Sequence, residues 1–204
     1  ELSAIDTTQV EAVVVTGNQK SFGAGANLKE IRAAQLSGTS DEYVGSGHDA
    51  FGVLAEMDVP TFSLITGVAL GGGLELALHT DYRLSTSGKA PMGLPECHLG
   101  FFPGWGGVHL LPHLVGAEAA LNIIVTDSMR GKNLNPAKAA EIGLVDAVLE
   151  GAPGSEQWDT SWQNWVVEVL EGKHEPRRTT DDAQTWDAAV QKAAAKAEQA
   201  WHGA

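Results

Sequence analysis

The chain has 204 residues, 43% of them hydrophobic, which is enough for one domain with a substantial core and some appended elements. Its 26 acidic and 13 basic side chains give a formal net charge of −13, and this argues against nucleic acid or an anionic membrane as the main partner. No stretch approaches the roughly 18 apolar residues of a membrane span. The single cysteine, Cys97, cannot form an internal disulfide, so a reducing, cytoplasmic location is expected.

The first part of the chain predicts a buried strand followed by helix. Residues 12–16 are short, β-branched and closed by a glycine, as in a buried parallel strand. Residues 21–27 form a small-residue loop, and residues 28–36 have the apolar spacing of a helix. The glycines in residues 37–49 predict a mobile connection or lid, and residues 51–57 predict a helix that stops before Pro60.

The next part is dominated by three consecutive glycines. An apolar strand over residues 61–66 leads to Gly71–Gly73, and a helix is expected over residues 72–80. A helix start leaves backbone N–H groups without partners, and glycine lets a ligand approach them closely. Short strands are expected over residues 82–85 and 90–93.

The remaining elements alternate helix and strand and then become helical. The expected elements are a glycine-rich turn at 103–107 leading into a helix, a helix at 116–125, a helix capped by Asn135 and Pro136 and ended by Gly143, and a strand at 144–149. Alternating strands and helices predict an α/β protein with a largely parallel sheet. Beyond residue 150 we expect two tryptophan-bearing helices, at about 156–171 and 182–201.

The tryptophans of those last helices need an apolar partner surface. The core, another subunit or a further domain could provide it. They are Trp158, Trp162, Trp165, Trp186 and Trp201.

Two histidines are spaced as metal ligands could be, but the context does not favour a metal site. His109 and His113 would share one helix face, yet Pro112 lies between them and no acidic third ligand is near in sequence. We therefore expect no metal. The dinucleotide, phosphate-loop and nucleophile-elbow motifs are also absent from the sequence.

Two glutamates stand in suggestive places, although each has an ordinary explanation. Glu75 falls in the first turn of the helix after the triple glycine, where an acidic residue also complements the helix dipole. Glu96 lies in a short Leu-Pro-Glu-Cys segment and could be a plain loop carboxylate.

Five blocks in order resemble the crotonase (enoyl-CoA hydratase/isomerase) superfamily over about residues 10–150. The blocks are Ser-Phe-Gly-Ala-Gly-Ala-Asn-Leu-Lys-Glu (21–30), Gly-Val-Ala-Leu-Gly-Gly-Gly-Leu-Glu-Leu-Ala (67–77), Gly-Leu-Pro-Glu (93–96), Phe-Pro-Gly-Trp-Gly-Gly (102–107) and Ala-Ala-Glu-Ile-Gly-Leu-Val-Asp (139–146). The resemblance implies a crotonase (ClpP-like) fold of repeated ββα units around a mainly parallel sheet, with C-terminal helices. It implies a core domain at 1–150 that lacks the family's first strands, and a shortened helical region at 151–204.

The resemblance also implies the site. The amides of Ala26 and Gly72 would form an oxyanion hole, and Glu75 and Glu96 would act as catalytic base and acid in adding water to an enoyl-CoA. Acyl-CoA binding is expected at Ala24, Leu28, Lys29 and Trp105, although Lys29 could be a solvated helix lysine, and Trp105, Phe101 and Phe102 could be core residues. Asn27 stands where the family more often has aspartate. No cofactor is expected beyond the CoA carried by the substrate.

The resemblance is greatest to the hydratase half of multifunctional fatty-acid-oxidation proteins. It implies hydration of trans-2-enoyl-CoA in β-oxidation, by a homo-oligomer such as a trimer or by a module joined to a 3-hydroxyacyl-CoA dehydrogenase. Two alternatives remain at this point: Δ3–Δ2 enoyl-CoA isomerisation, and a non-catalytic acyl-CoA-binding or scaffold domain.

Overall fold

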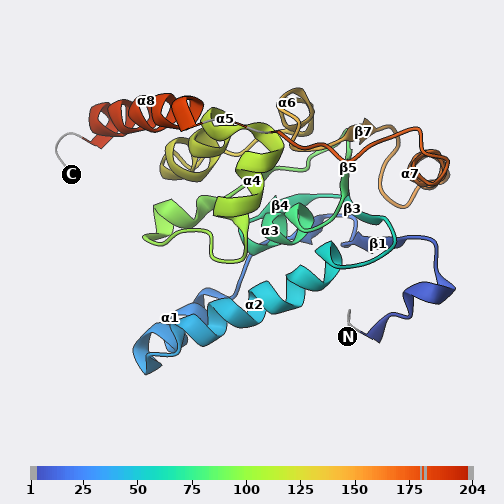
Figure 1. Cartoon of the computed structure of the whole chain (residues 1–204), viewed down its shortest axis with the longest axis horizontal. Coiled ribbons are helices and arrows are strands. Elements are labelled where there is room, and N and C mark those ends of the chain that lie inside the picture. The colour runs from blue at the N-terminus through green and yellow to red at the C-terminus, as the bar shows by residue number, and fades with distance from the viewer. Residues whose placement is uncertain (1–3, 180, 182, 202–204) are drawn as a thin grey trace.

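A computed structural model describes residues 4–179, 181 and 183–201, and within this part of the chain two parallel sheets form the centre (Figure 1). The larger sheet has the strand order β1-β3-β5-β7, with β1 (Val13–Thr16), β3 (Thr61–Ile65), β5 (Tyr82–Thr86) and β7 (Ala147–Leu149). The smaller sheet has the order β2-β4-β6, with β2 (Ser21–Gly23), β4 (Val68–Leu70) and β6 (Met92–Gly93). All the pairings within these sheets are parallel, as the sequence predicts.

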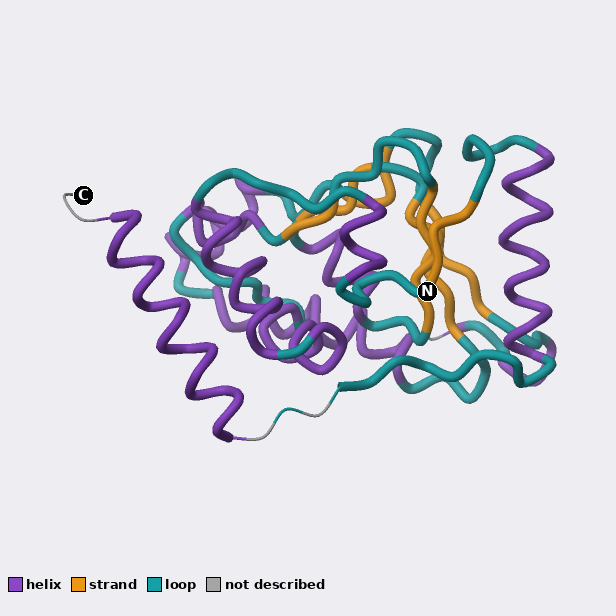
Figure 2. The backbone as a smooth tube through the Cα atoms, turned by 90° about the horizontal axis from the view of Figure 1, so that it is seen from above, coloured by secondary structure: helices purple, strands orange, loops and turns teal. Residues whose placement is uncertain are grey.

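Helices cover the sheets on both sides. Figure 2 shows the strands between the long helix α7 on one side and most of the remaining helices on the other. In chain order the helices are the 3-10 helix Thr7–Gln9, α1 (Leu28–Ser37), α2 (Ser40–Ala55), α3 (Gly72–Leu78), the 3-10 helix η3 (Pro95–Leu99), α4 (Gly107–Val115), α5 (Ala117–Leu121), the π-helical turn η4 (Asn122–Asp127), α6 (Pro136–Glu141), α7 (Glu156–Leu170) and α8 (Ala183–Trp201).

The chain repeats one pattern, in which a strand of the large sheet is followed by a strand of the small sheet and then by a helix. The three repeats are β1-β2-α1, β3-β4-α3 and β5-β6-η3. Because parallel strands end at the same edge of a sheet, the loops after β2, β4 and β6 come together. These loops contain three of the blocks that resemble the crotonase superfamily.

The tryptophans of α7 find their apolar partner in the protein's own core. Trp158 is 2% exposed and packs with Phe62 and Leu84 of the large sheet, and Trp162 and Trp165 pack against the same cluster. Helix α7 therefore covers the outer face of that sheet. Trp186 of α8 is partly buried, and the side chain of Trp201 lies outside the described part of the structure.

The segment 37–49, predicted as a mobile connection, is largely helix, so this prediction is wrong. Gly38 ends α1 in the left-handed conformation, with φ of 74°, and α2 then runs through Gly45 and Gly47. Glycine costs a helix about 1 kcal/mol relative to alanine, but tertiary packing outweighs that cost here. A Cβ on Gly47 would come within 2.1 Å of the Trp105 indole nitrogen, so only glycine lets α2 approach this ring.

Two further elements are shorter than predicted. The helix expected at 116–125 changes into the π-helical turn Asn122–Asp127, whose wider turn buries both Ile123 and Ile124. The strand expected at 144–149 begins only at Ala147, because Leu144 instead accepts a hydrogen bond from the Arg83 side chain (Nε to O, 3.0 Å).

Other local predictions are confirmed. The Asn135 side chain caps α6 by accepting from the Lys138 N–H at 2.8 Å, and Pro136 is the first helical residue. No helix in the described ranges is long and apolar enough to cross a membrane.

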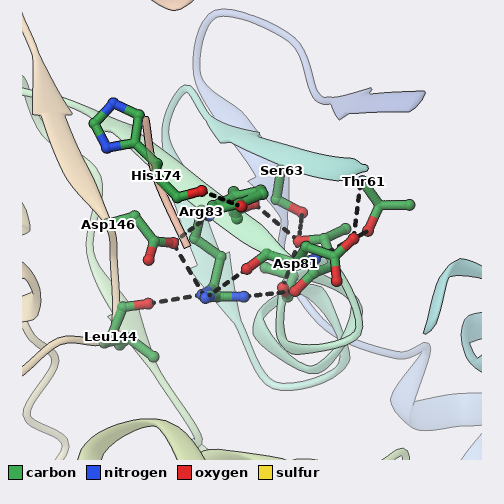
Figure 3. Close-up of polar contacts among 10 residues, drawn as sticks. Thr61, Ser63, Asp81, Arg83, Leu144, Asp146 and His174 are labelled. Atoms are coloured by element: carbon green, nitrogen blue, oxygen red, sulfur yellow. Dashed lines mark hydrogen bonds and ion pairs between the residues drawn. The ribbon is translucent and has the colours of Figure 1, made fainter. Parts of the chain in front are cut away.

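A buried arginine ties the large sheet together (Figure 3). The Arg83 guanidinium is fully buried and donates to the backbone oxygens of Thr80, Asp81 and Leu144. Its Nη2 also lies 3.1 Å from Asp146 Oδ2, which accepts the Arg83 backbone N–H as well. The bonds to Leu144 and Asp146 join β5 to the segment just before β7, whereas those to Thr80 and Asp81 stay within the turn before β5.

We predict that Asp146→Ala lowers the free energy of unfolding by about 3–5 kcal/mol, because it leaves a buried guanidinium without its countercharge. Chemical denaturation monitored by tryptophan fluorescence measures this change. The matched control is Glu141→Ala, which removes the exposed ion pair between Lys138 and Glu141 and should cost no more than about 1 kcal/mol. Equal losses in the two variants would show that the buried pair is not special.

Candidate active site

One apolar cavity of about 180 Å³ collects almost all of the predicted site residues. It lies where the loops after β2, β4 and β6 meet, and α2 and the turn before α4 close it. Its lining includes Ala24, Ala26, Leu28, Gly72, Glu75, Glu96 and Trp105, together with Phe101 and Phe102. Lys29 is exposed and is not among the lining residues.

The floor of the cavity is the turn from β4 into α3. Gly71 has φ of 53° and ψ of −131°, a conformation that side chains rarely adopt. A Cβ on Gly73 would lie 2.1 Å from the Gly23 oxygen, so the two backbones touch directly. This approach brings the loop after β2 down onto the first residue of α3.

Two backbone amides, those of Ala26 and Gly72, are neighbours as a result. A Cβ built on Gly72 would lie 3.7 Å from the Ala26 nitrogen, and one built on Gly25 would lie 3.9 Å from the Gly72 nitrogen. Gly72 is the first residue of α3, where an N–H has no intrahelical partner. The Ala26 N–H donates to no acceptor among the described residues. Two donors of this kind can stabilise an oxygen that gains negative charge.

Glu75 is buried and anchored by the next turn of the chain. Its Oε1 accepts the backbone N–H groups of Trp105 at 2.7 Å and of Gly107 at 2.9 Å. Burial raises the pKa of Glu75, while the two amides and His48 oppose that rise. These two hydrogen bonds hold the carboxylate in place through one of its oxygens, Oε1.

Glu96 is also buried, and the one backbone amide that acts on its carboxyl group is its own. Its Oε2 has no hydrogen-bond partner among the described residues, and its Oε1 lies 2.8 Å from the position that a Cβ on Gly71 would take. Burial, together with the nearby charge of Glu75, raises the pKa of Glu96 to about 7. A carboxyl group with this pKa can carry a proton at neutral pH and release it.

Trp105 forms the wall between the cavity and α2. Tyr43, Gly47 and Phe51 are spaced four residues apart on α2 and all meet this indole, with ring centroids 5.6 Å away for Tyr43 and 5.4 Å for Phe51. Tyr43 and Val44 also line the cavity. None of these residues is among those predicted from the sequence, although the four-residue spacing of Tyr43, Gly47 and Phe51 is a signal that they share one helix face.

Asn27 has a structural part at the entrance. Its Oδ1 accepts from the Lys29 N–H at 3.1 Å and so caps α1, and its amide nitrogen donates to Glu30. Asparagine therefore keeps the capping function that an aspartate would have at this position.

The rings of His109 and His113 on α4 lie edge to face, with centroids 5.1 Å apart. Within the described ranges no group of three His, Cys, Asp or Glu side chains is placed to hold a metal ion.

Comparison with known sequences and structures agrees with this geometry. The sequence pattern of the enoyl-CoA hydratase/isomerase family matches residues 2–200. The chain belongs to this family, and its fold is the crotonase fold.

Particular relatives make the similarity concrete. The chain is 40% identical over 138 residues to the fatty acid oxidation complex subunit alpha of Shewanella oneidensis, an alignment that covers 67% of this chain and 19% of that one. The chain thus spans about a fifth of the length of this curated relative. Among solved structures, Pseudomonas aeruginosa DspI matches with a TM-score of 0.68 at 29% identity, over 94% of this chain and 72% of that one. An enoyl-CoA hydratase from Thermoplasma volcanium shares the fold, with a TM-score of 0.68 at 24% identity over 95% and 75% of the two chains.

The buried carboxyl of Glu96 should make stability depend on pH. Folded Glu96 keeps its proton up to about pH 7, whereas the ordinary pKa is 4.5, so folding takes up a proton between these values. We predict that the contribution of Glu96 to the free energy of unfolding falls by about 3 kcal/mol as the pH rises from 5 to 8.

Glu96→Gln should remove most of this fall, because glutamine does not titrate. Urea denaturation at several pH values measures it, and the exposed Glu56→Gln is the matched control, expected to keep the wild-type slope. A Glu96→Gln protein with an unchanged slope would contradict the prediction.

Proposed function

We propose that the protein hydrates trans-2-enoyl-CoA thioesters to 3-hydroxyacyl-CoA. The observation that carries the proposal is that two buried carboxyl groups, Glu75 and Glu96, line one apolar cavity and differ in their hydrogen-bond partners. One is held by amide donors and the other lacks a partner for Oε2, which favours a base and an acid respectively. Family membership supports the same reaction class.

The thioester carbonyl would lie between the amides of Ala26 and Gly72. When water adds to C3 of the enoyl group, negative charge moves onto this oxygen as an enolate develops. Backbone dipoles already fixed in place stabilise that charge without reorganising. The adjacent positions of the two amides support this assignment.

The two carboxyl groups would move the protons. Glu75 would take one proton from water through the oxygen that the Trp105 and Gly107 amides leave free, while the water oxygen bonds to C3. Glu96 would deliver a proton to C2, and a raised pKa suits that donor. Transfer of the proton from Glu75 back to Glu96 would restore the starting state.

The rest of the substrate would use the surrounding residues. The loop from Ala24 to Leu28 would contact the CoA moiety through its backbone, and Lys29 beside it would contact a phosphate. Trp105, Phe101 and Phe102 would border the acyl chain, since all three line the cavity. The reaction is proposed to need no cofactor beyond the CoA of the substrate, and no metal.

The wider setting is also a proposal. Similarity to fatty acid oxidation complex subunits supports a place in β-oxidation, in the cytoplasm, with a 3-hydroxyacyl-CoA dehydrogenase acting on the product. We propose residues 1–150 as the catalytic core and 151–204 as a helical region, and a homo-oligomer such as a trimer or a dehydrogenase-linked module as the assembly.

The direct test is turnover of crotonyl-CoA, followed by loss of enoyl absorbance. Wild type should hydrate it, while Glu75→Gln and Glu96→Gln should each lower kcat by at least about 100-fold, because each removes a proton-transfer group. Glu56→Gln, on the exposed end of α2, is the control with wild-type kcat.

A 3-enoyl-CoA substrate separates the alternatives. Isomerisation that depends on one glutamate, with no hydration, would replace the proposal by Δ3–Δ2 isomerase. Binding of CoA esters without turnover of either substrate would leave a non-catalytic acyl-CoA-binding domain.

A further inference from the structure

The two amides that anchor Glu75 belong to a glycine-rich turn whose one large side chain is Trp105. The turn contains Gly104, Gly106 and Gly107 around Trp105, and Gly106 is in the left-handed region with φ of 109°. Glycines give a chain freedom to move, so contacts from other segments must hold the Trp105 and Gly107 amides on Glu75 Oε1. The packing of the Trp105 indole on Tyr43 and Phe51 of α2 is one of them.

His79 touches this turn from the opposite side. Its Nε2 lies 2.8 Å from the Trp105 oxygen, and the residue is 9% exposed. A Cβ on Gly106 would come within 2.8 Å of the same nitrogen, and Phe51 meets the ring edge-on at 5.9 Å. The imidazole is therefore fixed between α2 and the turn.

Glu75 lies in the middle of α3, and His79, four residues further on, is the C-cap of that helix. Residues at this spacing lie on the same face of a helix. Both therefore point toward the 104–107 turn, where Glu75 accepts from N–H groups and His79 meets the carbonyl of Trp105. Helix α3 and its C-cap residue therefore contact the turn through two side chains.

We propose that His79 is a positioning residue for the reaction: its Nε2–H holds the Trp105 carbonyl and so keeps two N–H donors on the Glu75 carboxylate. This inference rests on the proposed hydratase function. His79 itself touches neither substrate nor reacting atoms; it acts through the turn.

The protonation state of His79 agrees with this positioning role. A carbonyl only accepts, so Nε2 carries the hydrogen, and burial lowers the pKa of His79 so that the ring stays neutral. The titratable groups around it are Glu75 on its own helix and His48 on α2. Across the adjoining cavity lie Asp81, His113 and Arg178.

Two substitutions distinguish a hydrogen bond from mere space filling. In His79→Gln the amide nitrogen can stand where Nε2 stands and donate to the Trp105 oxygen. In His79→Asn the amide nitrogen corresponds to Nδ1, and the shorter side chain does not reach the Trp105 oxygen. His109→Asn, an exposed histidine on α4, is the matched control.

With crotonyl-CoA, His79→Asn should lower kcat by about 10- to 100-fold with little change in KM, since small misplacement of a reacting group has effects of this size. His79→Gln should recover most of the kcat. The rise of kcat/KM with pH should also move to higher pH in His79→Asn, because weaker amide bonds raise the pKa of Glu75. Equal losses in the Gln and Asn variants, or a wild-type kcat in both, would overturn the proposal.

A second readout needs no turnover. In ligand-free protein, the amide protons of Trp105 and Gly107 should resonate far downfield in wild type, His79→Gln and His109→Asn, and move upfield in His79→Asn. Unchanged amide resonances in His79→Asn would overturn the inference even if activity falls. If wild type hydrates no enoyl-CoA, the proposed function fails, and these resonances still decide whether His79 holds the turn. Thermal unfolding midpoints show whether each variant is folded.

Discussion

The candidate site depends on one close contact, the backbone of Gly73 against the backbone of Gly23. The two chains come so near that a Cβ on Gly73 would lie 2.1 Å from the Gly23 oxygen, and this contact seats the loop after β2 on the start of α3. From it follow the adjacent Ala26 and Gly72 amides, and the position of Glu75 one turn into the helix. The parallel small sheet supplies the rest, because its third strand ends beside the same turn and delivers Glu96.

The ionisable groups buried in the interior differ in their hydrogen-bond partners. Arg83 is surrounded by carbonyl oxygens and a carboxylate, which offset the cost of burying its charge and make it structural. Glu75 receives two amides, and Glu96 receives no partner for Oε2 from the described residues. A buried polar atom without a partner lowers stability, and such sites are where proteins commonly place reactive groups. The contrast explains why Glu96, and not Arg83, is the group whose protonation is finely balanced.

Sequence patterns predicted most elements from local signals such as the Asn135–Pro136 cap, whereas the residues of the candidate site came from the resemblance of blocks such as Gly71–Gly73 with Glu75 to the crotonase superfamily. The helix in residues 37–49 is not predicted from the sequence, since Gly45 and Gly47 count against a helix in isolation while the Trp105 ring requires a glycine at 47. Contacts between distant segments were also invisible, and these include the Arg83 bond to Leu144, which shortens β7, and the His79 bond to Trp105. In each case a tertiary partner decides what the local pattern leaves open.

Helix α3 has only seven residues, yet it carries an amide donor at Gly72 and a carboxylate at Glu75, with His79 at its end. Their relative directions are set by helical phase, in which each residue turns the chain by about 100°. A substitution at Leu76 would alter packing and leave these directions intact. Insertion or deletion of a single residue between Glu75 and His79 would rotate one away from the turn that both contact. The number of residues in this segment is therefore more strictly constrained than their identities. New chemistry on this scaffold would have to arise by substitution, which keeps the helical phase, and not by insertion or deletion.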